Sequence, residues 1–345
     1  MDFMILNKDF QTIAMVDTYE SAIWTDRYDQ YGDFEIYLPA SKAAWLLFEQ
    51  DYYLWTKQSD HLMIIEGKEI ATDVEVGNKL IVTGRSLESI LDRRIIWKQT
   101  NYSGKIQDVI RQMITECIIN PSDQKRKIAN FVFQDNDDHE IDDITVEIQC
   151  TGDNLYDTIV QLLTPYHIGF EIKLNDQNQF VFRLYYGVDR SYEQSTNPFV
   201  VFSPDFDNII NSNYLENSSA YKNVVLVGGE GEGDSRKMIT VPTSDIATGL
   251  ERREMFQDAR HIRDATDQQL VQVGQMTLSE NTIKKAFEGE METVQMFVYN
   301  RDFYLGDIVQ IVNEYGVESR SRVTEMIMNQ SDTGYSAYPT FSVVQ

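Results

Sequence analysis

Both ends of the chain are dominated by short stretches in which apolar and polar residues alternate. In the stretch DFEIYLP, the apolar residues Phe34, Ile36 and Leu38 occupy every second position. A period of two places alternate side chains on opposite faces of a β-strand. Strands are also expected in the segments 4–16, 61–85, 290–298, 306–312, 321–330 and 334–344. We therefore predict a small β-barrel at each end of the chain, over residues 1–95 and 285–345.

Between these ends the pattern changes to a mixture of helices and strands. Apolar residues recur at helical spacing from Ile106 to Cys117 and again within 153–163. Two alternating strands follow at 169–174 and 179–186. This part is predicted to form a second compact unit, so the fold class is α+β and multi-domain, with two small β-barrels enclosing the α+β domains.

A stretch rich in Ser, Asn and Pro marks a domain boundary near residue 205. Beyond it we expect a β-hairpin and one long helix from about Asp264 to Phe287. Thr266 and Gln269 have the spacing of a capping box for this helix. The predicted domains are 1–95, 96–205, 206–284 and 285–345.

The charge of the chain restricts its partners. Its 345 residues include 55 acidic and 30 basic side chains, a formal net charge of −25. Proteins hold nucleic acids chiefly through Lys and Arg contacts to phosphates, so stable nucleic-acid binding is not expected. An acidic surface instead repels DNA. The densest basic run, Lys125, Arg126 and Lys127, is expected on an outer or partner-facing surface.

The chain is expected to be soluble and to be made in the cytoplasm. No apolar run approaches the ~18 residues of a membrane span, and the first ten residues lack the basic start of a signal peptide. No membrane insertion is therefore expected. Cys117 and Cys150 are expected to be buried thiols and not a disulfide. The tryptophans are expected in the core, at Trp24, Trp45, Trp55 and Trp97.

The stretch NVVLVGGEGEGDSRKMITV contains an unusual glycine motif. A dinucleotide fingerprint requires G-x-G-x-x-G leading into a helix, whereas here the spacing is G-x-G-x-G and a strand-like segment follows. Glu230 and Glu232 would also repel a pyrophosphate. We therefore interpret Gly229, Gly231 and Gly233 as the tip of a mobile β-hairpin, where glycine permits positive φ.

The sequence contains no motif with the spacing of a catalytic or metal site. Gly104 and Lys105 lack the context of a P-loop, and neither a G-x-S-x-G elbow nor an H-E-x-x-H helix is present. The four histidines are not paired at metal-ligand spacing. We therefore predict no catalytic residue, no metal ligand and no cofactor.

Two other functions stay open at this point. A carbohydrate-active hydrolase could use paired carboxylates such as Glu20 with Asp26, or Glu251 with Glu254, although no spacing selects a pair. A calcium-dependent adhesion module could use the acidic segment 135–143. This segment departs from the EF-hand pattern at its glycine and at its terminal glutamate.

Several stretches together resemble the tail-hub proteins of siphophages, also called tail-associated or Tal proteins, of the ReqiPepy-six type (gp-thirty-seven-like). The Gly-Glu stretch followed by an arginine, the segment GLERREMFQDAR, and the closing stretches YLGDIVQIV, RVTEMI and GYSAYPTF resemble successive parts of this family. The likeness runs from about residue 19 to residue 343. The N-terminal motif SAIWTDRYDQYGDFEIYLP contributes Trp24, Arg27, Tyr28, Gly32 and Phe34.

The resemblance implies a structural protein of a phage or prophage tail and not an enzyme. Three copies would form a ring or cup at the tail tip, with the two barrels of each chain alternating in quasi-sixfold symmetry. The implied partners are the distal tail protein ring, the C-terminus of the tape-measure protein, and receptor-binding or fibre proteins. DNA would pass an acidic inner surface without stable binding. The protein would reside at the virion tail tip after synthesis in the host bacterial cytoplasm.

The same resemblance suggests a use for the Gly-Glu loop, which would contact a neighbouring copy or close the pore. Because the sequence stops at Gln345, straight after the predicted closing barrel, no peptidoglycan hydrolase is expected. The candidate partner-contact residues are Gly229, Glu230, Gly231, Glu232, Gly233 and Arg236.

Overall fold

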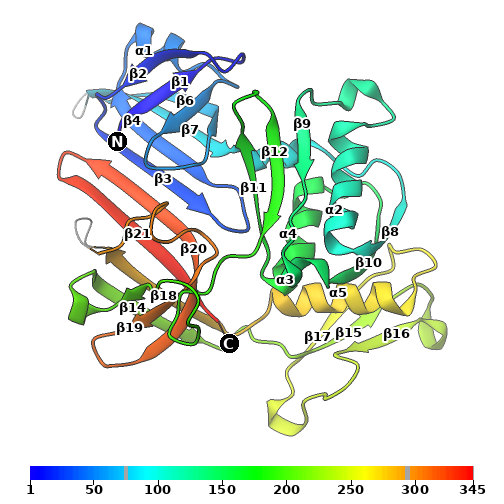
Figure 1. Ribbon diagram of the computed structural model, residues 1–345. Coiled ribbons are helices and arrows are strands. Elements are labelled where there is room, and N and C mark those ends of the chain that lie inside the picture. Colours follow the sequence, from blue (N-terminus) through cyan, green and yellow to red (C-terminus); the bar gives the residue numbers. More distant parts are fainter. Residues whose placement is uncertain (74–76, 292–295, 345) are drawn as a thin grey trace. The chain divides into compact units, whose positions relative to one another are not determined.

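The computed structural model describes residues 1–73, 77–291 and 296–344 (Figure 1). Its contacts divide the chain into two compact units, each built from segments far apart in the sequence. Unit 1 consists of residues 1–90, 169–214 and 286–345, and unit 2 consists of residues 91–168 and 215–285. The four consecutive domains stay a prediction, but this division places both ends of the chain in one unit.

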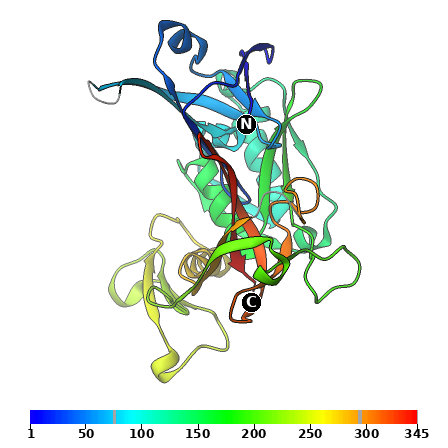
Figure 2. The same ribbon diagram turned by 90° about the vertical axis from the view of Figure 1, so that its left-hand side faces the viewer.

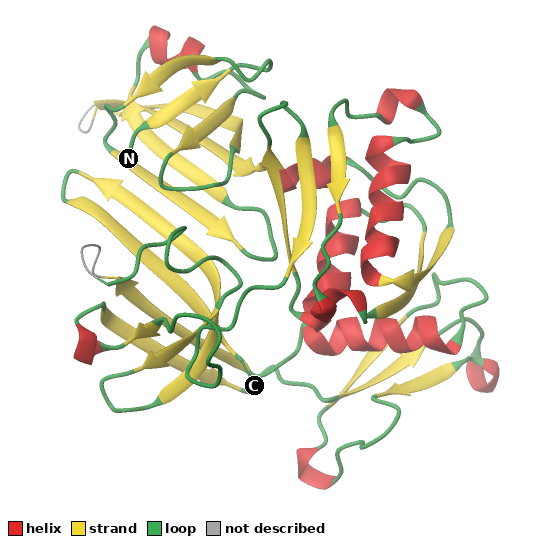
Figure 3. Ribbon diagram, viewed as in Figure 1, coloured by secondary structure: helices red, strands yellow, loops and turns green. Residues whose placement is uncertain are grey.

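Unit 1 is mostly β-sheet (Figure 3). Its helix α1 (Lys42–Leu47) begins after Ser41, whose side chain accepts a hydrogen bond from the backbone N–H of Ala44, as the sequence predicts. Its strands are β1 (Phe3–Leu6), β2 (Thr12–Val16), β3 (Ser21–Arg27), β4 (Asp33–Pro39), β5 (Tyr53–Thr56), β6 (Met63–Asp73), β7 (Gly77–Ser86), β11 (Gly169–Leu174), β12 (Phe180–Tyr185), β13 (Val201–Phe202), β14 (Ile209–Asn217), β18 (Lys284–Met291), β19 (Ile308–Val312), β20 (Glu318–Ser331) and β21 (Gly334–Val343).

Thirteen of these strands form one sheet. Its main path is β14-β18-β21-β20-β3-β4-β7-β6-β5-β1-β2, and β19 pairs with both β20 and β13. Strand β4 buries Phe34, Ile36 and Leu38 on one face, as the alternation predicts. Strands β11 and β12 form a separate antiparallel hairpin, as predicted. Residues 292–295 of the predicted strand 290–298 lie outside the described residues; β18 ends at Met291, and residues 296–298 are not in a strand.

The two ends of the chain meet where β3 pairs antiparallel with β20, from Arg27 opposite Glu325 to Ser21 opposite Ser331. Figure 2 shows the red C-terminal strands beside the blue N-terminal ones. The pairings among the described strands trace an open path and close no barrel. The mixed α+β class, rich in sheet, is therefore confirmed, whereas two separate barrels at the chain ends are not.

The N-terminal motif lies at this junction. Trp24 is fully buried and donates from Nε1 to Asp26 Oδ1 over 2.8 Å. Arg27 Nε binds Glu325 Oε1 of β20 at 2.6 Å. These contacts explain why the motif combines an aromatic residue with a cation: the ring fills the core and the guanidinium joins the two chain ends.

Tyr28 extends this junction, because its ring occupies a niche that only glycine leaves open. Tyr28 is 2% exposed. At Gly306, φ is +87° and a Cβ atom would lie 2.3 Å from the Tyr28 ring. At Gly169, an added Cβ would lie 2.2 Å from the same ring. The niche therefore depends on glycines from two distant segments of unit 1.

Unit 2 combines helices with small sheets. Helix α2 (Ile106–Ile114) continues as a π-helical turn over Thr115–Ile119, which confirms the predicted helix. The other helices are α3 (His139–Asp142), α4 (Leu155–Leu163) and α5 (Asp267–Ser279). The strands are β8 (Thr100–Lys105), β9 (Phe131–Gln134), β10 (Thr145–Cys150), β15 (Val224–Gly228), β16 (Met238–Val241) and β17 (Glu254–Asp258).

Helix α5 covers one face of the three-stranded sheet β16-β15-β17. Val225 and Val227 of β15 are fully buried and share a core with Leu270 of α5. Strands β8 and β10 form a second, antiparallel pair. The predicted capping box is present: Thr266 and Gln269 bond reciprocally at the start of α5.

The predicted end of α5 is wrong. The helix stops at Ser279, where the sequence pattern predicts Phe287. The side-chain amide of Asn281 donates a hydrogen bond to the carbonyl of Thr277 over 2.8 Å. It thereby provides a partner for a carbonyl group in the last turn of the helix. Phe287 instead lies in β18 opposite Phe341, fully within the core of unit 1. Pairing with a distant strand outweighs local helical spacing here.

None of the helices in the described part of the chain is long and apolar enough to cross a membrane.

Candidate partner-contact site

The Gly-Glu stretch forms a hairpin tip in unit 2, as the sequence predicts. β15 and β16 pair antiparallel from Val225 opposite Val241 to Gly228 opposite Met238. At the tip, Gly231 has φ +109° and Gly233 has φ +54°, a backbone region that favours glycine. The loop contains a single 3-10 turn, Gly233–Ser235, and a strand follows it, so it lacks the α-helix N-terminus on which a phosphate cradle is built.

Arg236 fastens the base of this loop. Its Nε donates to the carbonyl of Gly229 at 3.0 Å, and its Nη2 donates to the carbonyl of Gly228 at 2.8 Å. Nη2 also binds Asp258 Oδ1 at 2.7 Å, and the guanidinium lies 5.2 Å from the centre of the Phe256 ring. Arg236 therefore works as an internal clamp between three strands.

Glu230 is also held within its own unit. Its carboxylate accepts from Arg263 Nη1 at 2.7 Å and from the backbone N–H of Asp264 at 3.2 Å. The hydrogen bond from Arg263, with the one from Asp264, lowers the pKa of Glu230. Both contacts tie the loop to the segment that precedes α5.

The six candidate residues thus fall into two groups. Gly229, Glu230 and Arg236 are buried or bound to neighbours in unit 2. Glu232 and Gly233 are exposed, and Gly231 is partly exposed. Glu230 is exposed as well, but Arg263 holds its carboxylate, so Glu232 and Gly233 are the exposed candidates at the tip of the loop.

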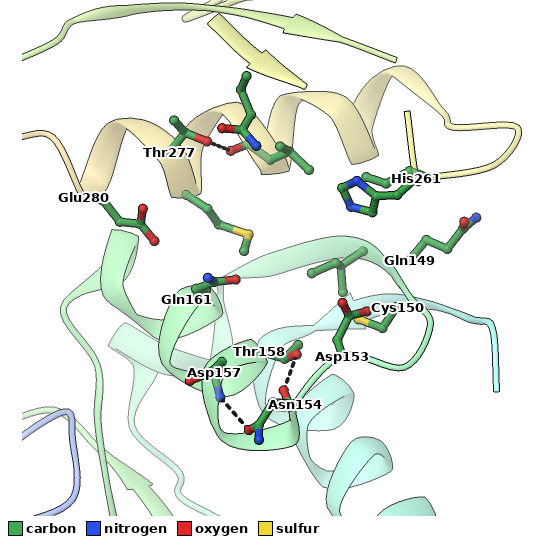
Figure 4. A pocket seen from close by; sticks show the side chains of 15 residues that line it. Gln149, Cys150, Asp153, Asn154, Asp157, Thr158, Gln161, His261, Thr277 and Glu280 are labelled. Carbon is green, nitrogen blue, oxygen red and sulfur yellow. Dashed lines mark hydrogen bonds between the residues drawn. The ribbon is translucent and has the colours of Figure 1, made fainter. Parts of the chain in front are cut away.

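A groove of ≈ 340 Å³ lies elsewhere in unit 2, between α4, β10 and α5 (Figure 4). Asn154 caps α4 by accepting hydrogen bonds from the backbone N–H groups of Tyr156 and Asp157. Cys150 lines the groove, but burial raises the pKa of its thiol to about 12, so the thiol is not a nucleophile at neutral pH.

Unit 1 contains a buried polar network that the sequence pattern does not indicate. Asp26 is fully buried, and its carboxylate accepts hydrogen bonds from Trp24, Ser59 and Tyr299 at distances of 2.7–3.1 Å. Burial raises its pKa, and a charged His61 nearby offsets part of that effect. The proposed hydrolase pair with Glu20 is not supported, because Glu20 is exposed and binds Lys79 Nζ at 2.8 Å.

His61 and Glu88 form the second half of this network. His61 Nδ1 lies 3.4 Å from Glu88 Oε1, and both side chains are almost fully buried. Burial by itself would lower the pKa of His61, but Asp26 and Glu88 together raise it to about 9. Burial would raise the pKa of Glu88, but the hydrogen bond with His61 leads to a net lowering. His61 is therefore a buried cation at neutral pH.

This network borders a cavity of ≈ 300 Å³ in unit 1. Glu171 lines the cavity and binds Arg183 and Lys173. Opposite charges neutralise each other around its wall, so the cavity favours neither anions nor cations. No local signal could have identified the network, because its members are adjacent only after the strands pair.

The acidic segment 135–143 is not arranged as a calcium site. Asp135 binds Arg111 Nε at 2.9 Å, Asp138 caps α3, and Asp142 lies 3.9 Å from Lys105. Within the described part of the chain, no group of three or more His, Cys, Asp or Glu side chains could hold a metal ion.

Two further predictions have opposite outcomes. Cys117 and Cys150 are free and buried, as expected. Trp97, expected in the core, is 65% exposed, because the Arg126 guanidinium stacks on its ring at 5.0 Å in place of apolar side chains.

Glu254 of the second proposed carboxylate pair binds Arg252 at 2.6 Å on the surface.

Comparison with solved structures shows that the fold is shared by phage and prophage tail proteins. A 43 kDa tail protein of prophage MuSo2 from Shewanella oneidensis matches with a TM-score of 0.60 and 9% identity, over 100% of this chain and 98% of that one. A tail protein from Neisseria meningitidis MC58 matches with a TM-score of 0.57 and 12% identity, over 99% and 95%. Prophage tail protein gp18 from Listeria monocytogenes EGD-e matches with a TM-score of 0.55 and 12% identity, over 99% and 94%.

The sequence itself matches one family of tail proteins. The model of the Siphovirus ReqiPepy6 Gp37-like protein family covers residues 2–341. The chain belongs to this family, which confirms the resemblance drawn from its motifs. No curated protein matches the sequence.

Proposed function

We propose that this chain is the subunit of a trimeric hub at the tip of a siphophage or prophage tail. Three copies form a ring or cup that closes the tail tube and carries the parts that recognise the host. In each copy, the two ends of the chain supply two small β-modules, so that three chains present six similar modules in quasi-sixfold order.

The pairing of β3 with β20 carries this proposal. It places the N-terminal and C-terminal strands side by side in one sheet of unit 1. A chain whose ends were separate could not present two modules at a fixed spacing. Membership of a tail-protein family supports the same proposal.

The tip of the Gly-Glu loop, Gly231–Gly233, is proposed to contact a neighbouring subunit or to narrow the pore. It is exposed, whereas the base of the loop is fastened by Arg236. A loop whose base is held by hydrogen bonds and whose tip is exposed can contact a partner at a defined position.

The further partners proposed are the distal tail protein ring, the C-terminus of the tape-measure protein, and receptor-binding or fibre proteins. The net charge of −25 supports passage of DNA without stable binding. We propose that the protein resides at the virion tail tip, is not an enzyme and needs no cofactor. No observation in the site favours the hydrolase or the calcium module.

A reconstruction of the tail tip tests the proposal directly. We expect three copies of the chain beneath a sixfold distal ring, and light scattering of the assembled hub should give about three times 40.0 kDa. A single copy, or six copies, at the tip would contradict the proposal.

A further inference from the structure

A cluster of basic side chains surrounds Trp97 in unit 2. The Nε of Arg94 donates to the carbonyl of Arg126 at 3.1 Å, and Nη2 of Arg126 donates to the carbonyl of Ile95 at 2.6 Å. These bonds bring two segments of the chain together. We call the resulting cluster the basic patch; it consists of Arg93, Arg94, Lys98, Lys125, Arg126 and Lys127.

Apart from Arg93, the cations of the basic patch are not neutralised by ion pairs within the described part of the chain. Most arginines of this protein bind a carboxylate, as Arg236 does with Asp258. By contrast, no ion pair among the described residues involves Arg94, Arg126 or the lysines of the patch. Burial and the neighbouring guanidinium groups of Arg126 and Arg93 lower the pKa of Arg94. Mutual repulsion of this kind is relieved when an anionic group binds.

A cavity of ≈ 350 Å³ adjoins the patch; Trp97, Lys98 and Arg126 line it, together with Tyr102 and Glu116, whose side chains are hydrogen-bonded to each other. The exposed indole of Trp97 and the cations beside it suit an acidic peptide segment, whose carboxylates face the cations while its aliphatic parts cover the ring. DNA is a poorer fit, because the rest of the chain is strongly acidic.

The same unit contains a segment with the opposite charge. The acidic segment 135–143 includes Asp137, Glu140 and Asp143, for which the described residues provide no ion pair. It lies at the start of α2, where Asp142 approaches Lys105. The basic patch lies at the other end of this helix, where Cys117 contacts the carbonyl of Ile95. The two charged surfaces are about 20 Å apart along the helix.

We propose that the basic patch of one copy binds the acidic segment 135–143 of a second copy. This inference rests on the proposed function. A contact between two different surfaces of identical chains is heterologous, and it closes into a ring when the rotation between copies is suitable. Placement at opposite ends of α2 keeps the two surfaces apart within one copy and leaves both available to neighbours.

Charge reversal tests the proposal without disturbing the fold. Lys98, Lys125 and Lys127 are exposed, and their side chains form no hydrogen bond or ion pair with the described residues, so K98E/K125E/K127E should fold normally and weaken association about tenfold or more. D137K/E140K/D143K should have the same effect. The matched control combines all six substitutions, which keeps the net charge at that of the wild type and should restore association.

Zero-length cross-linking identifies the contact even if association is weak. A carbodiimide is applied to a mixture of ¹⁴N- and ¹⁵N-labelled chains, alone and on the distal tail ring. We expect mixed-isotope cross-links between Lys98, Lys125 or Lys127 and the segment 135–143. Cross-links of the lysines only to the distal ring, or DNA binding that K98E/K125E/K127E abolishes, would overturn the proposal. Trimers that lack such cross-links would also overturn the proposed contact, but they would be consistent with the proposed trimeric hub. Failure to find three copies at the tail tip would instead contradict the proposed hub.

Discussion

The charges around His61 in unit 1 and those around Trp97 in unit 2 are organised in opposite ways. In unit 1, Asp26, His61 and Glu88 are buried; Asp26 accepts hydrogen bonds from neutral donors, and His61 pairs with Glu88. In unit 2, Arg126 stacks on an exposed indole and no carboxylate among the described residues pairs with it. The first set of charges stabilises the fold, whereas the second is available for another molecule.

The largest effect is expected from breaking the buried pair. Glu88→Ala leaves a buried charged His61 without its partner and removes the acceptor of the Ile172 backbone N–H. Removal of one member of a buried ion pair costs roughly 3–5 kcal/mol. Urea unfolding, followed through tryptophan fluorescence, to which the buried Trp24 contributes, should show this loss.

The control for this prediction is Glu254→Ala, which removes a half-exposed partner of Arg252. We expect at most about 1 kcal/mol, as for other surface pairs. Equal effects of the two substitutions would show that burial does not distinguish the two kinds of charge.

A change of pH is expected to have a smaller effect on the free energy of unfolding. The pKa of His61 is about 9 in the folded protein and 6.5 in the reference state, so the folded state binds the proton more tightly. The resulting stabilisation is complete below about pH 6.5 and is lost as the pH rises through 9, by at most about 1.4 kcal/mol per pH unit. Urea unfolding at pH 6.5, 7.5 and 8.5 measures this slope, which His61→Gln should flatten. A slope that the substitution leaves unchanged would assign the pH effect to other groups.

Removing Arg236, which fastens the Gly-Glu loop, is expected to reduce the stability by an intermediate amount. Arg236→Ala removes charge-assisted hydrogen bonds to the carbonyls of Gly228 and Gly229, and should cost about 1–2 kcal/mol in unit 2. Arg260→Ala is the matched control, because Arg260 binds the same Asp258 but is exposed and makes no bond to the loop. Hydrogen exchange of the loop amides should increase only in the Arg236 variant.

The smallest effect on stability is expected from the basic patch. K98E/K125E/K127E should change the free energy of unfolding by no more than about 0.5 kcal/mol, because the three side chains are exposed. A large destabilisation would show that these lysines serve the fold, as the charges around His61 do, and would remove the contrast between the two regions.

Features whose signals lie within a few residues could be predicted from the sequence. Alternation identified β4, the spacing of Thr266 and Gln269 identified the start of α5, and Ser41 identified the start of α1. In each case the interacting groups are neighbours along the chain, so local geometry decides the outcome. The hairpin tip at Gly231 and Gly233 could be predicted for the same reason.

The sequence by itself thus determined the local elements, the charge and, through the order of its motifs, the family. Only the tertiary structure decided which distant groups meet. Arg27 and Glu325 are 298 residues apart in the sequence, and neither the end of α5 nor the exposure of Trp97 follows from local spacing. Such contacts depend on strand pairing and packing over the whole unit, where burial outweighs the propensity of any short segment.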